Sequence, residues 1–191
     1  MTNNKSVFIG LGANLPSELY GAPIKTLEAS LKVLIKCGVQ IVGQSRWYST
    51  LSFPDPNQPR YLNGVVSVKT NLTPIELLNL LNTIEKQFGR VRTVKNAPRI
   101  IDLDLLAFGN TIRTDDPPLL PHPRLAERIF VLRPLIDIEP SWKHPLFGLS
   151  AKELIKNLPS TDGIRLFNVT DEYRFLYNWL ALNIFMLIKC L

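Results

Sequence analysis

The sequence has few of the residues that hold disulfide-linked or zinc-bound domains together. Its 191 residues include two cysteines and two histidines. Cys37 and Cys190 lie at opposite ends of the chain without metal-ligand spacing, so neither a disulfide framework nor a zinc site is indicated. This favours a reducing, cytoplasmic setting. The start of the chain agrees, because one lysine and a short apolar run do not make a signal peptide.

Long apolar runs are also scarce. Residues 175–188 carry no charge, but these 14 positions include Asn178 and Asn183, and a bilayer span needs roughly 20 residues. We interpret residues 169–191 as an apolar, helical C-terminal extension that packs on the domain or on a second copy of it. An interfacial membrane helix is the less favoured alternative. A monomer and a homodimer both remain open.

The rest of the chain has the size and composition of one well-filled domain. With 46% hydrophobic residues, the sequence is long enough for one domain and short for two. We assign that domain to residues 1–168. The net charge of +6 favours an anionic partner such as a nucleotide, a nucleic acid or an acidic lipid. The stretch "GLGAN" (10–14) lacks the Lys-Ser/Thr end of a Walker A loop, and we interpret its glycines as turn and close-packing residues.

Periodicity predicts the order strand, helix, strand, strand, helix, strand. The strands are predicted over residues 6–13, 39–49, 61–70 and 97–108. One helix is predicted over residues 24–34, with Gly38 as a left-handed cap, and a second begins at Thr73 with a capping box that Glu76 completes. This order is typical of a split β-α-β sandwich, an α+β fold. Two long loops, 50–60 and 90–99, are expected at the surface.

The last of these strands, "APRIIDLDLLAF", contains two aspartates in an apolar setting. Asp102 and Asp104 share one face because strand side chains alternate, while Ile101, Leu103 and Leu105 cover the other. Two neighbouring carboxylates on a partly covered face repel each other and need cations. Magnesium takes oxygen ligands and binds substrate phosphates, so it answers that need. The alternative is a solvent-exposed face with ordinary surface aspartates.

Basic and aromatic residues surround the predicted aspartate strand. The preceding loop supplies Arg90, Arg92 and Arg99, and "PHPRLAERIF" supplies His122, Arg124 and Arg128. Guanidinium groups grip phosphate, and phosphoryl-type transfer depends on positioning and charge neutralisation. A carboxylate pair flanked by arginines therefore points to a polyphosphate substrate. Near the same loops, Tyr61 and Phe130 could stack on a flat heterocycle, with Asn63 on the strand face of Tyr61 reading its polar edge.

In these motifs the chain resembles the 6-hydroxymethyl-7,8-dihydropterin pyrophosphokinases of folate biosynthesis. The resemblance covers about residues 6–158, through "GLGANL", "NQPRYLNGVV", "IEKQFGRVR", "PRIIDLDLLAFGN" and "PHPRLAERIFVLRPL", in register. It implies a ferredoxin-like α/β sandwich, with a mainly antiparallel sheet flanked by helices. It also implies an ATP-dependent diphosphotransferase that uses two magnesium ions, passes the pyrophosphoryl group of ATP to the hydroxymethyl group of the reduced pterin, and releases AMP.

The resemblance also implies site residues. Asp102 and Asp104 would bind the metals. The catalytic residues would be Arg90, Arg92 and Arg99. The ATP-binding residues would be Glu85, Arg90, Arg92, Arg99, His122 and Arg128. The pterin-binding residues would be Thr50, Phe53, Tyr61, Asn63 and Phe130. The chain departs from the family pattern in "VKNAPR", where Arg-Trp-Gly-Pro-Arg is common, and in the 50–59 loop, which lacks a proline after its threonine.

Two other function classes are weaker. A ferredoxin-like RNA-binding module would carry an RNP-type aromatic strand, which is not found, and it would leave the two aspartates unexplained. We therefore expect no nucleic-acid partner. A nucleotidyltransferase could use the same Asp-x-Asp pair, but its usual Gly-Ser opening is replaced here by Gly12-Ala13.

Overall fold

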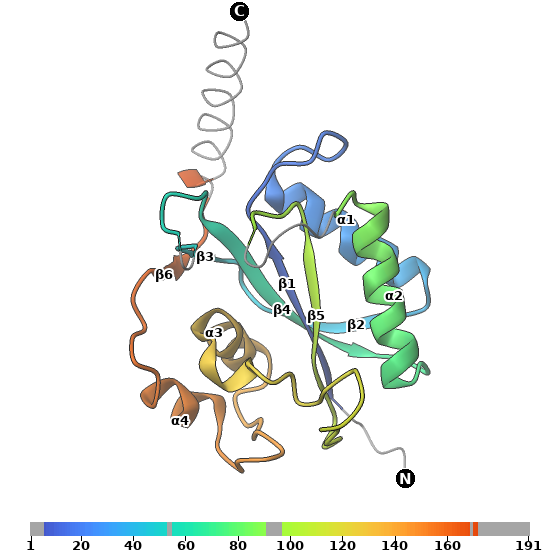
Figure 1. Cartoon of the computed structure of the whole chain (residues 1–191), viewed down its shortest axis with the longest axis vertical. Helices are drawn as coiled ribbons and strands as arrows, with labels where there is room; N and C mark the ends of the chain where they lie inside the picture. The colour runs from blue at the N-terminus through green and yellow to red at the C-terminus, as the bar shows by residue number, and fades with distance from the viewer. Residues whose placement is uncertain (1–5, 53–54, 91–96, 169, 172–191) are drawn as a thin grey trace, which may run out of the picture.

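The computed structural model describes residues 6–52, 55–90, 97–168 and 170–171. Figure 1 shows a sheet with helices on both faces. The strands are β1 (Val7–Ala13), β2 (Gln40–Gln44), β3 (Tyr48–Thr50), β4 (Tyr61–Lys69), β5 (Asp102–Phe108) and β6 (Ile164–Leu166). The helices are α1 (Pro23–Lys36), α2 (Pro74–Gln87), α3 (Ile129–Ile138) and α4 (Ala151–Lys156), with a 3-10 turn at Leu125–Glu127.

The sheet confirms the predicted α+β fold. Its strands lie in the order β5-β1-β4-β3-β6, with β2 also paired to β4, and each of these pairings is antiparallel. Taken as one bent strand, β2 and β3 are the second strand of the predicted series. The order across the sheet is then fourth, first, third, second. This is the arrangement of a ferredoxin-like sandwich.

The single strand predicted over residues 39–49 is wrong in one respect, because the structure breaks it between β2 and β3. At the break, the Ser45 hydroxyl accepts a hydrogen bond from the backbone N–H of Val65 at 3.0 Å. The Trp47 ring lies over Gly64, where a Cβ atom would come within 2.6 Å of a ring carbon. The strand therefore bends where a side chain replaces one backbone acceptor and a glycine admits a large ring.

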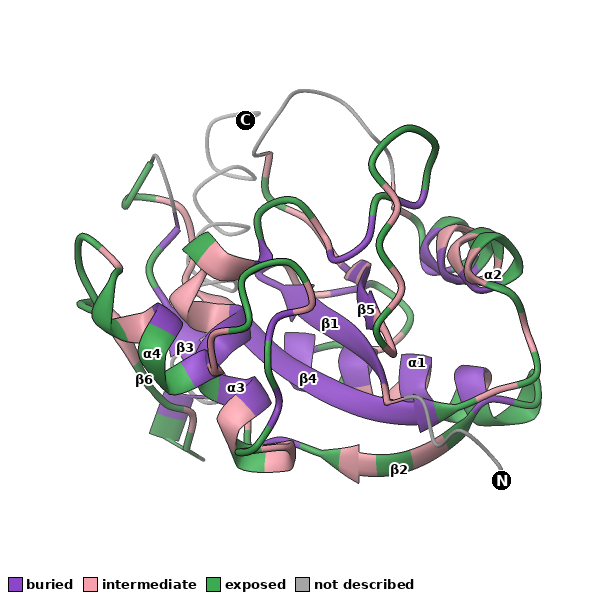
Figure 2. Ribbon diagram, turned by 90° about the horizontal axis from the view of Figure 1, so that it is seen from below, coloured by how far each residue is buried: buried purple, intermediate pink, exposed green. Residues whose placement is uncertain are grey.

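Two hydrophobic cores lie on opposite faces of the sheet. Figure 2 shows β1 buried along its length, and β4 is buried at every position except its two end residues. One core packs α1 and α2 against alternate residues of β1 such as Val7 and Ile9. The other packs α3 and α4 against Phe8 and Leu106. Because side chains alternate along a strand, Asp102 and Asp104 share the α3 face with Leu106.

The helix ends follow the predicted local chemistry. Thr73 caps α2 and forms the reciprocal capping box with Glu76. Gly38 follows α1 with φ of +83°, a left-handed conformation that glycine adopts without strain. Within the described ranges, no helix combines the length and apolar character that crossing a membrane requires. The predicted C-terminal extension lies outside the described residues, except for Thr170 and Asp171, and stays a prediction.

The sequence analysis did not predict α3, α4 or β6. The end of α3 is held to the sheet by Asp137, whose side chain is 14% exposed. Its carboxylate accepts hydrogen bonds from the Arg46 guanidinium at 2.6 Å and the Tyr48 hydroxyl at 2.9 Å. Burial opposes ionisation of Asp137, but these hydrogen bonds outweigh it and hold its pKa below the usual range. These contacts fix the position of α3 against the sheet, and Arg128 is the residue that directly precedes this helix.

This attachment gives a pH prediction. Because the pKa of Asp137 is lower in the folded than in the unfolded chain, its stabilisation is present above the ordinary carboxyl pKa, near 4, and is lost as the pH falls below it. We expect Asp137→Asn to lower the urea midpoint at pH 7, and the difference from wild type to shrink at about pH 3. A difference that stays constant between the two pH values would contradict this assignment.

Candidate functional site

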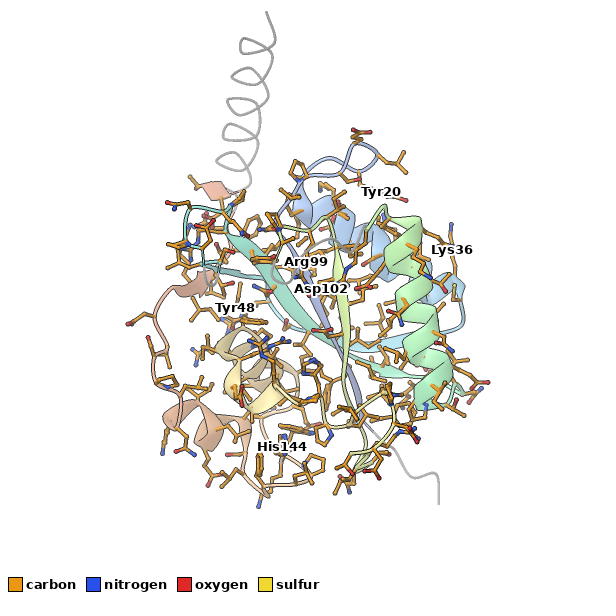
Figure 3. All side chains as sticks on the ribbon, in the orientation of Figure 1. Tyr20, Lys36, Tyr48, Arg99, Asp102 and His144 are labelled. Atoms are coloured by element: carbon orange, nitrogen blue, oxygen red, sulfur yellow. The ribbon has the colours of Figure 1, made fainter. Side chains whose placement is uncertain are left out.

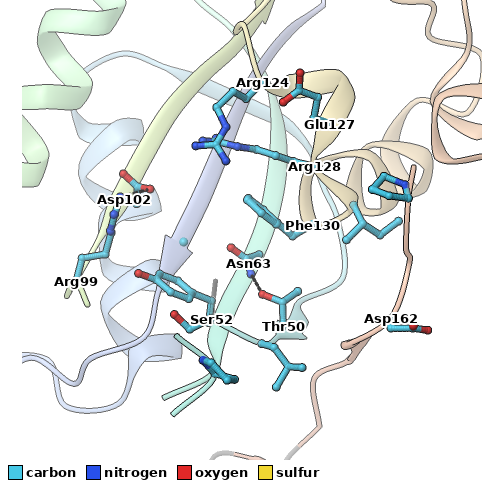
Figure 4. A pocket seen from close by; sticks show the side chains of 16 residues that line it. Thr50, Ser52, Asn63, Arg99, Asp102, Arg124, Glu127, Arg128, Phe130 and Asp162 are labelled. Atoms are coloured by element: carbon cyan, nitrogen blue, oxygen red, sulfur yellow. Dashed lines mark hydrogen bonds and ion pairs between the residues drawn. The ribbon is translucent and has the colours of Figure 1, made fainter. Parts of the chain in front are cut away.

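A cavity of about 640 Å³ opens between the sheet and α3. Figure 4 shows its side chains. It is lined by Gly12, Thr50, Leu51, Ser52, Pro56, Tyr61, Asn63, Arg99, Asp102, Arg124, Glu127, Arg128, Ile129, Phe130, Pro159 and Asp162. Asp102 and Arg99 lie at one end, Asp162 lies at the other, and Asn63, Thr50 and Phe130 lie between them. Beyond its charged end at Asp102 and Arg99, the pocket thus continues into a part with a ring and small polar side chains, which extends to Asp162 and is named here the ring-binding end.

Two glycines of β1 leave room beside the aspartates. Gly12 lies opposite Asp102 in the sheet, and Gly10 lies opposite Asp104. A Cβ atom on Gly12 would come within 3.2 Å of the Asn63 side-chain oxygen. The expectation of a turn at these glycines is therefore wrong, because both lie inside β1, whereas the expected close packing is confirmed. Gly12 leaves open the floor between Asp102 and Asn63.

Asp102, at the start of β5, is held by two arginines. Its two carboxylate oxygens lie 2.7 Å from Arg90 Nη1 and 2.8 Å from Arg99 Nη1. Figure 3 shows the Arg99 and Asp102 side chains next to each other beside the sheet. The pKa of Asp102 is raised, chiefly by burial and then by the Asp104 charge, against the opposing effect of both arginines. These pairs bring Arg90 and Arg99 against the first aspartate of the strand.

Asp104 is paired from the other side of the pocket. Its carboxylate lies 3.2 Å from Arg128 Nη1, just before α3. The Arg128 guanidinium carbon also lies 5.5 Å from the centre of the Phe130 ring. The two aspartates are therefore paired with different arginines. Arg128 contacts both the Asp104 carboxylate and the aromatic side chain in the middle of the pocket.

Glu85 lies beneath this end, between α2 and β5. Its side chain is 3% exposed, forms an ion pair with Arg90, and accepts a hydrogen bond from the Leu103 backbone N–H at 2.7 Å. Burial raises the pKa of Glu85, more than the Leu103 hydrogen bond and the Arg90 charge lower it. Glu85 does not line the pocket. It orients Arg90 and anchors the strand between the two aspartates.

The other end brings together the predicted ring-binding side chains. The Asn63 amide donates a hydrogen bond to the Thr50 hydroxyl at 2.8 Å. The Tyr61 hydroxyl donates to the Ala97 carbonyl at 3.3 Å, and burial raises the pKa of that hydroxyl. Phe130 faces these residues from α3 (Figure 4). This end could hold a flat ring with polar edges.

Some predicted site residues stand apart from the pocket lining. Arg90, Asp104 and His122 are not among its lining residues. The His122 backbone N–H donates to the Leu106 carbonyl at 2.8 Å, and its Nδ1 accepts from the Arg124 N–H at 3.1 Å. Burial lowers the pKa of His122. Arg92 and Phe53 lie outside the described residues, so their assigned roles remain predictions.

Sequence reasoning assigned no role to Asn14, which joins three segments of the site. Asn14 is fully buried. Its side-chain oxygen accepts from the Arg99 N–H at 2.7 Å, and its amide donates to the Pro59 carbonyl at 3.1 Å. The end of β1 is thereby tied to the segments that lead into Arg99 and Tyr61. The sequence feature that could have identified Asn14 as a site residue is its place in the "GLGANL" motif.

The donor set at the charged end suits a hard cation. Asp102 and Asp104 offer two carboxylates on one strand face, and no cluster of three or more His, Cys, Asp or Glu that could bind a metal is found in the described part of the chain. A site with only two protein carboxylates fits magnesium, which takes its other ligands from water and substrate phosphates. It does not fit zinc, which prefers nitrogen and sulfur.

The fold and the pocket define a ferredoxin-like α/β sandwich with a site that is charged at one end and ring-binding in character at the other. Residues 8–140 match the family described as 7,8-dihydro-6-hydroxymethylpterin-pyrophosphokinase (HPPK). The chain belongs to that family, which confirms the resemblance seen in its sequence motifs.

The chain is also similar in sequence or in fold to individual known proteins. The chain is 36% identical over 154 residues to the 2-amino-4-hydroxy-6-hydroxymethyldihydropteridine pyrophosphokinase of Synechocystis, covering 80% of this chain and 76% of the relative. It is 33% identical to the folic acid synthesis protein fol1 of Schizosaccharomyces pombe over 96% of this chain, yet spans only 24% of that protein. A crystal structure of Plasmodium falciparum HPPK-DHPS with pterin and p-hydroxybenzoate shares the fold, with a TM-score of 0.65 at 15% identity, covering 88% of this chain and 48% of the other.

Proposed function

We propose that this chain transfers the pyrophosphoryl group of ATP to the hydroxymethyl oxygen of 6-hydroxymethyl-7,8-dihydropterin. The pterin hydroxyl oxygen attacks the β-phosphorus and loses its proton, the bond from that phosphorus to the α-phosphate oxygen breaks, and AMP leaves. The products are AMP and the pterin diphosphate. Family membership supports this reaction, and it matches the names that the relatives carry.

One observation carries the proposal. The Asp102 carboxylate and the Arg99 and Arg128 guanidinium groups line a single pocket. Asn63, Thr50 and Phe130 lie beside them in the same pocket (Figure 4). A transfer between a polyphosphate and an alcohol on a flat ring requires the two substrates to meet end to end. A pocket with both chemistries in one line provides that arrangement.

The charged end would hold the triphosphate. Magnesium at Asp102 and Asp104, proposed as two ions, would supply positive charge between the carboxylates and the phosphates. Arg99 and Arg128, which pair with these aspartates, would donate hydrogen bonds to phosphate oxygens, and Glu85 would keep Arg90 oriented. Charge neutralisation by preorganised guanidinium groups is a main source of rate in phosphoryl-type transfer.

The opposite end would hold the pterin. Tyr61 and Phe130 would pack on its ring, and the Asn63 and Thr50 side chains would exchange hydrogen bonds with its polar edge. We further infer that ATP and the reduced pterin are the partners, with no nucleic acid. A cytoplasmic setting and a monomer or homodimer complete the proposal.

Product analysis tests the proposed function. Purified protein is incubated with magnesium, ATP and 6-hydroxymethyl-7,8-dihydropterin, and the nucleotides are separated by chromatography. AMP that forms only when the pterin is present is the expected result. ADP would replace pyrophosphoryl transfer with ordinary phosphoryl transfer, and the absence of turnover in the presence of both substrates would overturn the proposal.

A further inference from the structure

The pocket has a wall that lies outside the part of the chain matched to the family. Pro159 and Asp162 line the pocket, and both follow the matched residues 8–140. They belong to the segment 159–163, which joins α4 to β6 and is named here the end wall. Figure 4 shows Asp162 on the far side of Thr50 from Asp102. The end wall therefore borders the ring-binding end and not the phosphate end.

Arg60 holds the end wall in place. Its Nη2 donates to the Gly163 carbonyl at 2.5 Å and to the Ser49 carbonyl at 3.1 Å, while its Nε donates to the Ser49 hydroxyl at 2.8 Å. Ser49 lies in β3 and is 1% exposed. One guanidinium group thus joins β3 to the end wall, with two hydrogen bonds to Ser49 and one to Gly163.

The Arg60 hydrogen bonds are directed to backbone and hydroxyl oxygens. Among the described residues, no carboxylate forms an ion pair with it. Burial lowers the pKa of Arg60, with a further contribution from the Arg165 charge. A partly buried arginine with these partners satisfies its donors only while the end wall stays in position.

Gly163 also contacts the residue that follows β3. Its carbonyl also accepts from the Leu51 N–H at 3.3 Å. It has φ of +77°, and a Cβ atom there would lie 3.0 Å from Leu51 Cδ1. Leu51 itself lines the pocket beside Thr50. The position of Gly163 therefore sets how closely the end wall approaches the predicted pterin contacts.

We propose that Arg60 is a positioning residue that fixes the width of the pocket at its pterin end by holding the end wall against β3. The inference rests on the proposed function, because it assigns the ring-binding end to the pterin. Arg60 acts through Gly163 and Leu51 and touches neither substrate. It therefore controls affinity for the acceptor and leaves the phosphate end unchanged.

Steady-state kinetics of Arg60→Met test this role. Loss of the charged hydrogen bonds is expected to raise KM for the pterin about tenfold, with KM for ATP and kcat each within about twofold of wild type. Arg60→Lys should give a smaller rise in KM for the pterin, because an ammonium group keeps the charge and can donate to one of these oxygens. A rise remains because it cannot reproduce the fork between Ser49 and Gly163. Titration of the pterin by fluorescence measures the same affinity without turnover.

A second variant reaches the end wall without touching Arg60. Gly163→Ala should raise KM for the pterin in the same selective way, because it strains the backbone and crowds Leu51. Arg133→Gln is the matched control. It removes an exposed arginine from α3 that is not among the residues lining the pocket, and it should leave both KM values unchanged.

The outcomes separate this inference from the proposed function. If wild type forms AMP and Arg60→Met keeps its pterin affinity, the positioning role is wrong and the function stands. If Arg60→Met raises both KM values equally as its melting temperature falls, Arg60 is a general stability residue, and the inference is overturned. If wild type neither turns over nor binds the pterin, the function and the inference both fail.

Discussion

Asp102→Asn is expected to reduce AMP formation by about 10³-fold. The amide keeps the shape of the side chain but removes the negative charge that pairs with Arg90 and Arg99 and that would bind magnesium. Preorganised charge at the reacting phosphates contributes factors of about 10²–10⁵ in related chemistry. The measurement is the initial rate of AMP formation at saturating substrates, repeated over a series of magnesium concentrations.

The magnesium series identifies which role of Asp102 is lost. If the carboxylate binds the metal, Asp102→Asn should shift half-maximal activity to higher magnesium concentration. If it only orients Arg90 and Arg99, the rate should fall at an unchanged magnesium dependence. Asp116→Asn, in an exposed loop, is the control and should match wild type. A rate for Asp102→Asn within tenfold of wild type would contradict any central role for this carboxylate.

The parts of the site that sequence could predict depend on short-range rules. The strand alternation of two residues places Asp102 and Asp104 on one face, and the structure confirms this. Arg99 lies three residues before Asp102, so its approach to that carboxylate follows from its position in the chain. The start of α2 was equally predictable, because Thr73 and Glu76 satisfy each other locally.

Other parts depend on which segments meet in the folded chain. Gly12 leaves open the pocket floor only because β1 pairs with both β5 and β4, a fact of topology that its own neighbours in sequence do not encode. Asn14 bonds to Pro59 and Arg99, 45 and 85 positions away. The proline-rich composition around residues 117–134 obscured α3, which accommodates Pro134 within its length. Long-range partners decide each of these cases.

Glu85 shows the same limit most clearly, and replacing it should have the largest effect on stability. From the sequence, Glu85 is named only as an ATP-binding residue that the resemblance implies, and nothing in its neighbourhood predicts its burial. The structure buries this carboxylate against Arg90 and the Leu103 backbone N–H. Glu85→Ala leaves the Leu103 N–H without its acceptor and leaves Arg90 with Asp102 as its remaining carboxylate partner. Removing one partner of a buried ion pair costs about 3–5 kcal/mol, so we expect a loss of that size in the free energy of unfolding from urea titration at pH 7.

Two comparisons make the Glu85 prediction specific. Glu85→Gln retains an acceptor oxygen for the Leu103 N–H but not the charge that faces Arg90, so its loss should be smaller than that of Glu85→Ala. Glu28→Ala removes an exposed helix glutamate paired only with Lys25 and should change stability by no more than about 0.5 kcal/mol. A loss below about 1 kcal/mol for Glu85→Ala would mean that Arg90 and Leu103 find other partners, because an unmade buried hydrogen bond alone costs that much. Glu85 would then not be the group that anchors β5 beneath the two aspartates.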